Sequence, residues 1–292
     1  MKRLELLLAC VLLIHCSRSD AAPVTSAMKP PDHGSIAVAI LVSDGAVVID
    51  FAGPWEVFQD VRLPSRPNDM PFRLYTVSES AKPVRASGGM QIIPDYDFSN
   101  APAPEVIVIP AQHDPSEAAL EWIRKSAKKA DLTMSVCTGA FVLAKTGLLS
   151  GKSATTHHGA FTAFAMSFPD VQLKRGARFV EDGKLATAGG LSSGIDLALR
   201  VVERYYGREV AQATAFQMEY QGQGWLDPAS NQVYARAAAS TDEHPLCPVC
   251  GMEVDPRHAA KSVYQGKPYW FCSQDDKAQF DSSPTAFAAA AK

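Results

Sequence analysis

The sequence has few cysteines, no long basic run and no apolar segment long enough to span a membrane. Its 292 residues contain six cysteines at irregular spacing, which excludes a small disulfide-framework protein. The formal net charge is −3 and Lys and Arg do not cluster, so binding to nucleic acid or to an anionic membrane surface is not expected. The most apolar run, residues 6–14, is too short for a permanent transmembrane helix.

The composition is that of a globular protein with a sizeable core. Hydrophobic residues make up 47% of the chain and charged residues 20%. These values exclude a disordered or fibrous chain. At roughly 150 residues per domain, the length predicts about two domains.

The N-terminal segment has the features of a secretory signal. Lys2 and Arg3 precede the apolar run, and small and polar residues follow it at 17–22. We expect residues 1–21 to be a signal peptide cleaved after Ala21, and the protein to be exported to a periplasmic compartment. A lipid anchor at Cys16 is the alternative, although His15 is an unfavourable residue before a lipidated cysteine. Residues 22–34 contain three prolines and are predicted to form a linker.

Residues 35–220 alternate between strand-like and helix-like patterns. The continuous apolar stretch at 36–42 is typical of a parallel strand that is buried on both faces. The predicted elements are strands at 36–42, 72–77, 105–109 and 132–136, a hairpin at 178–188, and helices from Trp55, at 116–130, at 139–149 and at 193–220 with a break near Gly207. This order predicts an α/β fold, a flavodoxin-like, mostly parallel sheet between helices, with functional residues beyond the carboxyl ends of the strands.

Cys137 lies where such a sheet places a functional residue. It falls between a predicted strand and a predicted helix, in the sequence Ser-Val-Cys-Thr-Gly. That pattern is typical of a nucleophile elbow with Cys in place of Ser. The helix N-terminus should lower the pKa of the thiol, and the following backbone N–H groups should stabilise an oxyanion. The alternative is a buried structural cysteine.

Four motifs in order carry a family resemblance: residues 49–58 (IDFAGPWEVF), 135–140 (SVCTGA), 154–157 (ATTH) and 187–196 (TAGGLSSGID). Together they resemble the ThiJ/PfpI family of the glutamine-amidotransferase-like superfamily, and within it the isonitrile hydratase-like proteins. The resemblance implies a small-molecule substrate, a cysteine nucleophile with no cofactor at that site, and a homodimer. The same domain forms the sensor half of some transcription regulators, but no helix-turn-helix block follows in this sequence.

The resemblance also implies roles for three neighbours of Cys137. Asp50 would be the carboxyl group beside the nucleophile, kept protonated by a neighbouring thiolate and available to transfer protons. Thr138 would supply a backbone N–H or hydroxyl group, and His157 would orient or activate water. The alternatives are that Asp50 caps local backbone and that His157 makes only structural hydrogen bonds, with His158 as a rival for its role.

One segment departs from the family pattern. Relatives often carry Pro-Gly-Gly after the strand at 105–109, where a glycine N–H approaches the reacting centre. Here the segment reads Pro110-Ala111-Gln112-His113. We expect the side chains of Ala111 and Gln112 to reshape the oxyanion side of the site, or Gln112 and His113 to line a pocket or a solvated loop.

The C-terminal part predicts a metal-binding module. After a polar linker at 221–243, Cys247 and Cys250 form a C-x-x-C knuckle and Cys272 supplies a distant third thiolate. Residues 244–287 resemble a YHS domain, in which a fourth Cys usually follows the third by four residues. The predicted ligands are therefore Cys247, Cys250, Cys272 and Asp276, with His244 or His258 as substitutes for Asp276. Zinc is the expected metal and copper the alternative; a disulfide such as Cys247–Cys250 would instead exclude a metal.

Two functional hypotheses follow. In the first, the protein is an exported cysteine-dependent enzyme that hydrates an isonitrile, or a related amidase, hydrolase or lyase acting on a small electrophilic carbon. In the second, it is a non-catalytic periplasmic metal or redox sensor, or a metal-handling protein, in which Cys137 is oxidised reversibly and the C-terminal module holds metal.

Overall fold

The computed structural model describes residues 26–235, 241, 245–249, 251 and 253–290. The predicted signal peptide, with Cys10 and Cys16, lies outside the described residues, as do Cys250 and His244.

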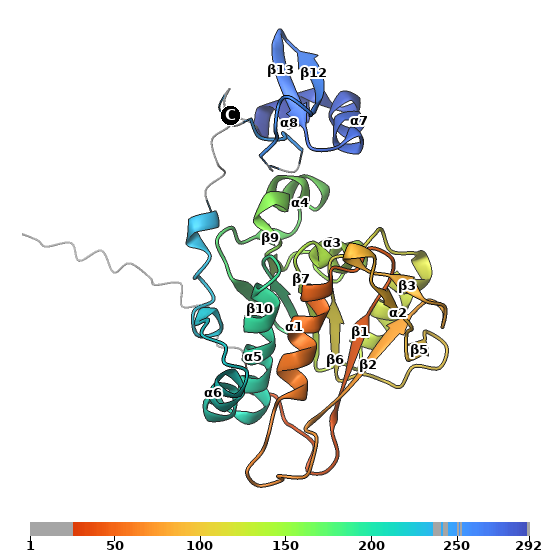
Figure 1. Ribbon diagram of the computed structural model, residues 1–292, viewed down its shortest axis with the longest axis vertical. Helices are drawn as coiled ribbons and strands as arrows, with labels where there is room; N and C mark the ends of the chain where they lie inside the picture. The colour runs from red at the N-terminus through yellow and green to blue at the C-terminus, as the bar shows by residue number, and fades with distance from the viewer. Residues whose placement is uncertain (1–25, 236–240, 242–244, 250, 252, 291–292) are drawn as a thin grey trace, which may run out of the picture.

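A seven-stranded sheet forms the centre of the large domain (Figure 1). The strand order is β10-β11-β7-β6-β1-β2-β5, and each pair is parallel except the β10–β11 hairpin. The strands are β1 (Ile36–Leu41), β2 (Phe72–Ser78), β5 (Tyr96–Asp97), β6 (Val106–Ile109), β7 (Leu132–Val136), β10 (Phe179–Asp182) and β11 (Leu185–Ala188). The predicted mostly parallel α/β sheet is confirmed.

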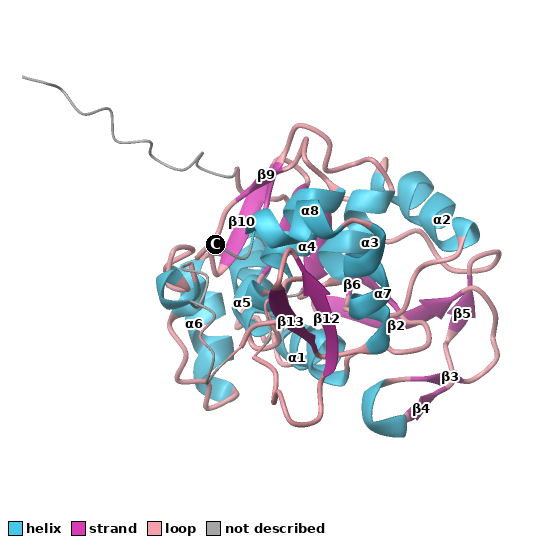
Figure 2. Cartoon of the chain, turned by 90° about the horizontal axis from the view of Figure 1, so that it is seen from above, coloured by secondary structure: helices cyan, strands magenta, loops and turns pink. Residues whose placement is uncertain are grey.

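Helices cover both faces of this sheet, as Figures 1 and 2 show. Alternate residues of β1 belong to two different hydrophobic clusters, with Val38 in one and Ala39 in the other. One cluster includes residues of α1 (Val48–Gln59), α5 (Ser193–Tyr206) and α6 (Arg208–Gln217); the other includes residues of α2 (Glu117–Ala127), α3 (Gly139–Lys145) and α4 (Phe161–Ser167). Burial on both faces explains why the strand sequence is continuously apolar.

Short elements complete the large domain. They are the hairpin β3 (Val84–Arg85) and β4 (Gln91–Ile92), the pair β8 (Ser153–Ala154) and β9 (Gln172–Leu173), and the 3-10 turns η1 (Ser87–Gly89), η2 (His158–Ala160), η3 (Gly224–Leu226) and η4 (Gln232–Tyr234).

The predicted start of the first helix was wrong. Helix α1 begins at Val48, and Pro54 lies inside it instead of at its N-terminus. Because Pro54 has no backbone N–H, it cannot donate to the carbonyl group of Asp50, and packing must compensate. Close packing against α5 explains why residue 53 is glycine, since a Cβ there would lie 2.8 Å from the side chain of Ile195. The pair therefore permits close helix packing, and Asp50 falls in the first turn of α1. The predicted break at Gly207 is confirmed, with φ at 89°.

Residues 221–235, predicted to be part of a linker, pack against the large domain. Trp225 is only 3% exposed and lies under the guanidinium group of Arg208, 5.6 Å from the ring centroid. The backbone N–H of Arg178 donates to the carbonyl oxygen of Pro228 at 2.7 Å. This segment is held by single contacts at irregular spacing. Its sequence therefore lacks the hydrophobic periodicity from which a helix or strand is predicted.

The C-terminal module has its own small core. Strands β12 (Ala260–Tyr264) and β13 (Lys267–Phe271) form a hairpin, followed by α7 (Gln274–Ser282) and α8 (Pro284–Ala290). Phe271, Phe280 and Phe287 are buried together with Cys247 in a hydrophobic cluster of this module (Figure 1, blue).

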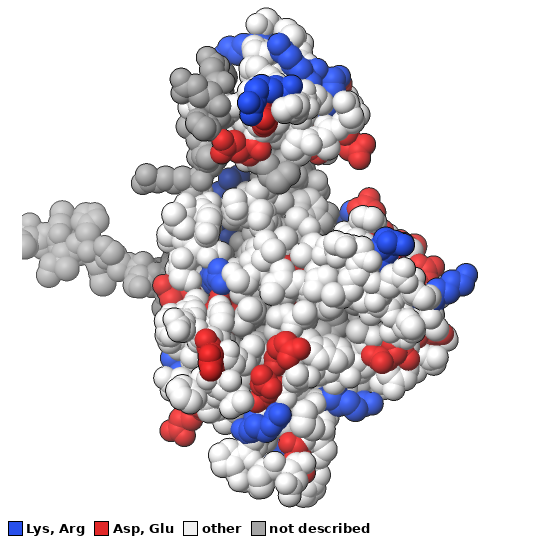
Figure 3. All heavy atoms as spheres, viewed as in Figure 1, with Lys and Arg blue, Asp and Glu red and all other residues white. Residues whose placement is uncertain are grey.

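Acidic and basic side chains are interspersed over the face shown in Figure 3. Among the described residues, no helix has both the length and the apolar character needed to cross a membrane.

Candidate functional site

Cys137 occupies a sharp turn between β7 and α3. Its φ is 58°, a left-handed conformation that is unusual for a non-glycine residue. Its backbone N–H donates to the carbonyl oxygen of Gly189 at 2.9 Å, which holds the turn against the adjacent strand end. A Cβ on Gly139 would lie 2.2 Å from the carbonyl oxygen of Ile109, so only glycine fits two residues after the cysteine. The geometry is that of the predicted nucleophile elbow.

Backbone and hydroxyl groups surround the thiol. The backbone N–H groups of Thr138 and Leu191 and the hydroxyl group of Thr138 hydrogen-bond to it, and each contact lowers the pKa of Cys137. Thr156 donates its hydroxyl to the carbonyl oxygen of Cys137 at 3.0 Å. Thr138 was predicted from the sequence, whereas Leu191 and Thr156 were not. The Gly189-Gly190 pair could have indicated that Leu191 lies near the thiol, since glycines let the chain pass close to the elbow.

Asp50 lies beside this thiol and is fully buried. Its Oδ2 accepts the backbone N–H of Ala111 at 3.1 Å. The Cys137 thiol hydrogen-bonds to the carboxyl group, whereas Oδ1 has no hydrogen-bond partner among the described residues. Burial raises the pKa of Asp50 to about 6, although the hydrogen bonds from Ala111 and Cys137 oppose the rise.

Burial and the negative charge of Asp50 raise the pKa of Cys137 to about 11. This direction is opposite to the one predicted from the helix N-terminus, because α3 is short and desolvation outweighs the hydrogen bonds from Thr138 and Leu191. Between about pH 6 and 11 the pair therefore holds one proton and one negative charge. The thiolate of Cys137 forms when that proton resides on Asp50.

The buried carboxyl group should make stability depend on pH. Because the pKa of Asp50 in the folded protein, about 6, lies above its ordinary value of 3.8, folding favours the protonated form, and this contribution is lost as pH rises from about 4 to 6. We expect Asp50→Asn, which stays uncharged, to unfold with a free energy up to about 3 kcal/mol higher than wild type at pH 7. Urea unfolding at pH 4 and pH 7 measures this. An equal difference at both pH values would contradict the coupling.

His157 lies close to the elbow loop without contacting the thiol through any hydrogen bond in the described part of the chain. It is half-buried, and its Nδ1 accepts the backbone N–H of Gly159 at 3.1 Å. Its ring packs against Gly190, where a Cβ would lie 2.4 Å from Cδ2. Burial, and to a lesser extent His158, lower the pKa of His157, which favours the neutral ring at pH 7.

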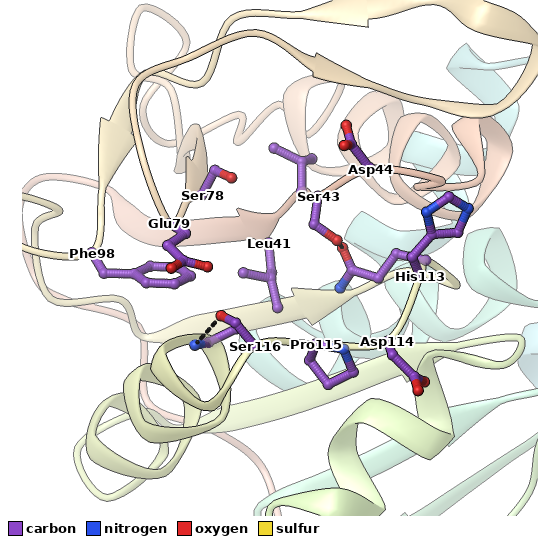
Figure 4. Close-up of a pocket in the computed structure, with 13 residues that line it drawn as sticks. Leu41, Ser43, Asp44, Ser78, Glu79, Phe98, His113, Asp114, Pro115 and Ser116 are labelled. Atoms are coloured by element: carbon purple, nitrogen blue, oxygen red, sulfur yellow. Dashed lines mark hydrogen bonds between the residues drawn. The ribbon is translucent and has the colours of Figure 1, made fainter.

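Gln112 and His113 line a different cavity, of about 330 Å³, at the carboxyl ends of β1 and β2. Ser43 donates to Oε1 of Gln112 at 2.7 Å, and Figure 4 shows Ser43 and His113 around this cavity. Cys137 and Asp50 do not line it. Pro110 and Ala111 of this departing segment do reach the elbow: a Cβ on Gly139 would lie 2.8 Å from the carbonyl oxygen of Pro110, and the N–H of Ala111 donates to Asp50.

Three of the four predicted metal ligands come together in the C-terminal module. One ligand atom each of Cys247, Cys272 and Asp276 lies within 4.8 Å of the others. Oδ2 of Asp276 accepts from the two thiols at 3.2 and 3.1 Å. Cys272 follows β13 directly, and Asp276 lies in the first turn of α7.

This arrangement fits a metal ion and does not include the proposed substitute His258. Ser273 caps α7 by accepting the backbone N–H of Asp276 at 3.0 Å, which fixes the turn between Cys272 and Asp276. His258 is instead paired with Asp255 at 3.2 Å. Two thiolates and a carboxylate are ligands that zinc accepts, and the carboxylate is the harder of the two ligand types.

The chain matches two protein-family models. The DJ-1/PfpI family model matches residues 36–204, and the YHS domain model matches residues 247–291. An isonitrile hydratase from Pseudomonas putida is 36% identical over 177 residues, which are 59% of this chain and 73% of that protein. The HTH-type transcriptional regulator GbdR from Pseudomonas aeruginosa is 27% identical over 154 residues, 51% of this chain and only 42% of the regulator.

Solved structures match the same architecture. A ThiJ/PfpI family protein from Pseudomonas syringae aligns with a TM-score of 0.57 and 24% identity, over 96% of this chain and 98% of that one. DJ-1beta from Drosophila melanogaster aligns with a TM-score of 0.54 and 21% identity, over 64% of this chain and all of that one. At these identities the similarity concerns the fold.

Proposed function

The chain belongs to the DJ-1/PfpI family, and from that premise we propose that it is an exported, cysteine-dependent enzyme that hydrates an isonitrile or a similar small electrophilic carbon. The observation that carries the proposal is the strained Cys137 with the buried Asp50 beside its thiol. The similarity to an isonitrile hydratase over 73% of that protein supports the choice of substrate class.

The chemistry needs one proton carrier beside one nucleophile. The sulfur of Cys137 bonds to the isonitrile carbon while the proton that it shares with Asp50 moves to that carbon, which gives a thioimidate. Water then adds to the same carbon, and Asp50 accepts a proton from it. Asp50 passes that proton to the nitrogen; cleavage of the carbon–sulfur bond then expels the thiolate, and Asp50 takes the remaining hydroxyl proton, which releases an N-substituted formamide and regenerates the pair. The N–H groups of Thr138 and Leu191 stabilise negative charge on sulfur during this cycle.

The N-terminal and C-terminal segments concern the location of this enzyme and its metal. The basic and apolar pattern of residues 1–21 supports export to the periplasm, and Cys16 is the site of attachment if the chain is instead lipidated. The YHS domain holds a metal ion through Cys247, Cys272 and Asp276, with Cys250 as the fourth ligand and zinc as the expected ion.

A direct test measures the product. Purified protein is incubated with a small alkyl isonitrile, and the formyl proton of the formamide is followed by NMR. We expect steady product formation by wild type and none by Cys137→Ala. Formation of product at equal rates by both proteins would remove Cys137 from the mechanism, and no product from fully reduced wild type would remove this substrate class.

The alternative function is metal handling or sensing, and the group formed by Cys247, Cys272 and Asp276 favours it as the second candidate. In that case metal binding, rather than a substrate of Cys137, would be the activity of the protein. Tight zinc binding together with an absence of turnover on isonitriles would support this alternative.

A further inference from the structure

A second cavity, of about 100 Å³, adjoins the elbow of Cys137. Thr156 lines it and also donates to the carbonyl oxygen of Cys137. Gly190 lines it as well, and it directly precedes Leu191, whose N–H reaches the thiol. Cys137 itself does not line the cavity, but residues that contact it or adjoin its contacts do.

The lining of the cavity is rich in hydrogen-bond donors. Nδ1 of His157 accepts the N–H of Gly159, so the proton of the neutral ring is on Nε2. That nitrogen faces Gly190, where a Cβ would lie 3.2 Å from it. The side chain of His157 therefore presents an N–H group to the cavity.

Asn231 and Ser193 add two further donors. Oδ1 of Asn231 accepts from Nη1 of Arg178 at 3.3 Å, and Arg has no acceptor, so the amide is oriented with Nδ2 as the donor, for which the described residues show no acceptor. The hydroxyl group of Ser193 is fully buried and has no hydrogen-bond partner within the described residues. A buried hydroxyl group without a hydrogen-bond partner costs free energy. A ligand oxygen that accepts from it would remove this cost.

Carboxylates do not line this cavity in the described part of the chain. The nearby Asp196 is paired with Arg178, since its Oδ2 accepts from Nε of Arg178 at 2.6 Å and from the hydroxyl of Tyr220 at 3.1 Å, whereas its buried Oδ1 has no partner among the described residues. Helix α5, of 14 residues, begins at Ser193, so the positive end of its dipole also lies here. Each of these features favours a negatively charged or strongly accepting ligand group.

We propose that this cavity is a subsite for a small carboxylate group of the substrate, held by His157, Ser193 and Asn231. The preferred substrates of Cys137 are then electrophiles that carry a carboxylate a few bonds from the reacting carbon. The inference rests on the proposed role of Cys137 as the nucleophile, but it does not require any particular turnover.

Part of this subsite lies outside the matched family domain. Asn231 and Tyr234 belong to the segment 221–235, whereas the family model ends at residue 204. The ring of Tyr234 stacks on His158 with centroids 4.9 Å apart, and His158 contacts the ring of His157 at 4.4 Å. The segment between the two domains thus supplies one wall of the site and sets its specificity.

Two alkylating reagents of nearly equal size test the proposal without turnover. Iodoacetate carries a carboxylate, and iodoacetamide replaces it with a neutral amide. The rate at which each modifies Cys137 is followed by mass spectrometry of the tryptic peptide 130–145, which contains this cysteine alone. The ratio of the two rates on protein unfolded in urea gives the intrinsic preference of the reagents.

We expect the iodoacetate-to-iodoacetamide ratio to be about tenfold higher on folded than on unfolded protein, and the iodoacetate rate to saturate with concentration. Asn231→Asp keeps the acceptor for Arg178 but turns the Nδ2 donor into a negative charge, so it should abolish the preference. Ser193→Ala, which leaves no group unpaired, should reduce it several-fold, and iodoacetamide rates should change less than twofold.

A ratio on folded wild type equal to that on unfolded protein would overturn the proposal, as would a ratio unchanged in both variants. Thermal melting of each variant shows that it is folded. If the ratio behaves as expected while isonitriles are not hydrated, the subsite stands and the proposed reaction fails; turnover of neutral isonitriles with no carboxylate preference gives the reverse result.

Discussion

Asp50→Asn will slow hydration of an isonitrile about a thousandfold and will at the same time speed alkylation of Cys137 by iodoacetamide at pH 8. The slowing follows because an amide cannot carry the proton between sulfur, carbon and water, and a positioned acid–base group contributes roughly 10²- to 10⁴-fold. The acceleration follows because the negative charge of Asp50 raises the pKa of Cys137, and the amide removes that charge.

The two effects are interpretable only on folded protein, because unfolding also removes the burial that raises the pKa of Cys137. A variant that merely unfolds would lose turnover, and its Cys137 would react with iodoacetamide at the rate measured in urea. Glu56→Gln is the matched control, since Glu56 is an exposed carboxylate on the same helix and hydrogen-bonds to Gln59. It should change neither rate. Slower alkylation in folded Asp50→Asn would show that Asp50 promotes the thiolate by a route other than the shared proton.

The sequence predicted the sheet because its strands are buried on both faces, which leaves continuous apolar runs such as residues 36–42. It also predicted the turn at Cys137, because small residues on both sides of a cysteine between a strand and a helix are typical of a nucleophile elbow. The start of α1 was misjudged, because a Gly-Pro pair at the start of a helix and one that serves packing inside a helix look alike in the sequence.

The groups that the sequence could not reveal are mostly backbone groups. The N–H of Leu191 reaches the thiol and the N–H of Ala111 reaches Asp50, and every residue except proline has such a group. Only the folded chain selects which of them meet the site. The raised pKa of Cys137 escaped prediction for a similar reason, since burial depends on distant segments whereas a helix N-terminus is visible locally.

The segment 221–235 shows a different limit of prediction from the sequence. Its contacts are single anchors, such as Trp225 in the core and Asn231 against Arg178, at no regular spacing. Periodicity therefore predicted a linker there, although the segment forms a wall of the cavity beside the elbow. Segments between recognised domains can thus belong to the site of one of them.

The largest expected effect outside the elbow concerns the metal site. Cys247→Ser should lower zinc affinity about 100-fold or more, because losing only the groups that support a ligand already costs 10- to 100-fold. Asp276→Ala should lower zinc affinity as well, since the carboxylate joins the two thiols in one group. Competition with a chromophoric chelator on reduced protein at pH 7 measures both affinities.

The variant Asp276→Cys tests whether Asp276 is a metal ligand or only a carboxylate near the site. A thiolate in place of the carboxylate would make the site softer, so its affinity for cadmium should rise relative to that for zinc, by about tenfold or more. Asp275→Asn is the matched control, since Asp275 is exposed in the same first turn of α7 and lies outside the group. If Asp275→Asn changes zinc affinity as much as Asp276→Ala does, the carboxylate of Asp276 acts through general charge and not as a ligand. If neither Asp276 variant alters metal preference, the fourth ligand must come from elsewhere and the pairing of Asp276 with the two thiols is only a hydrogen-bonded contact.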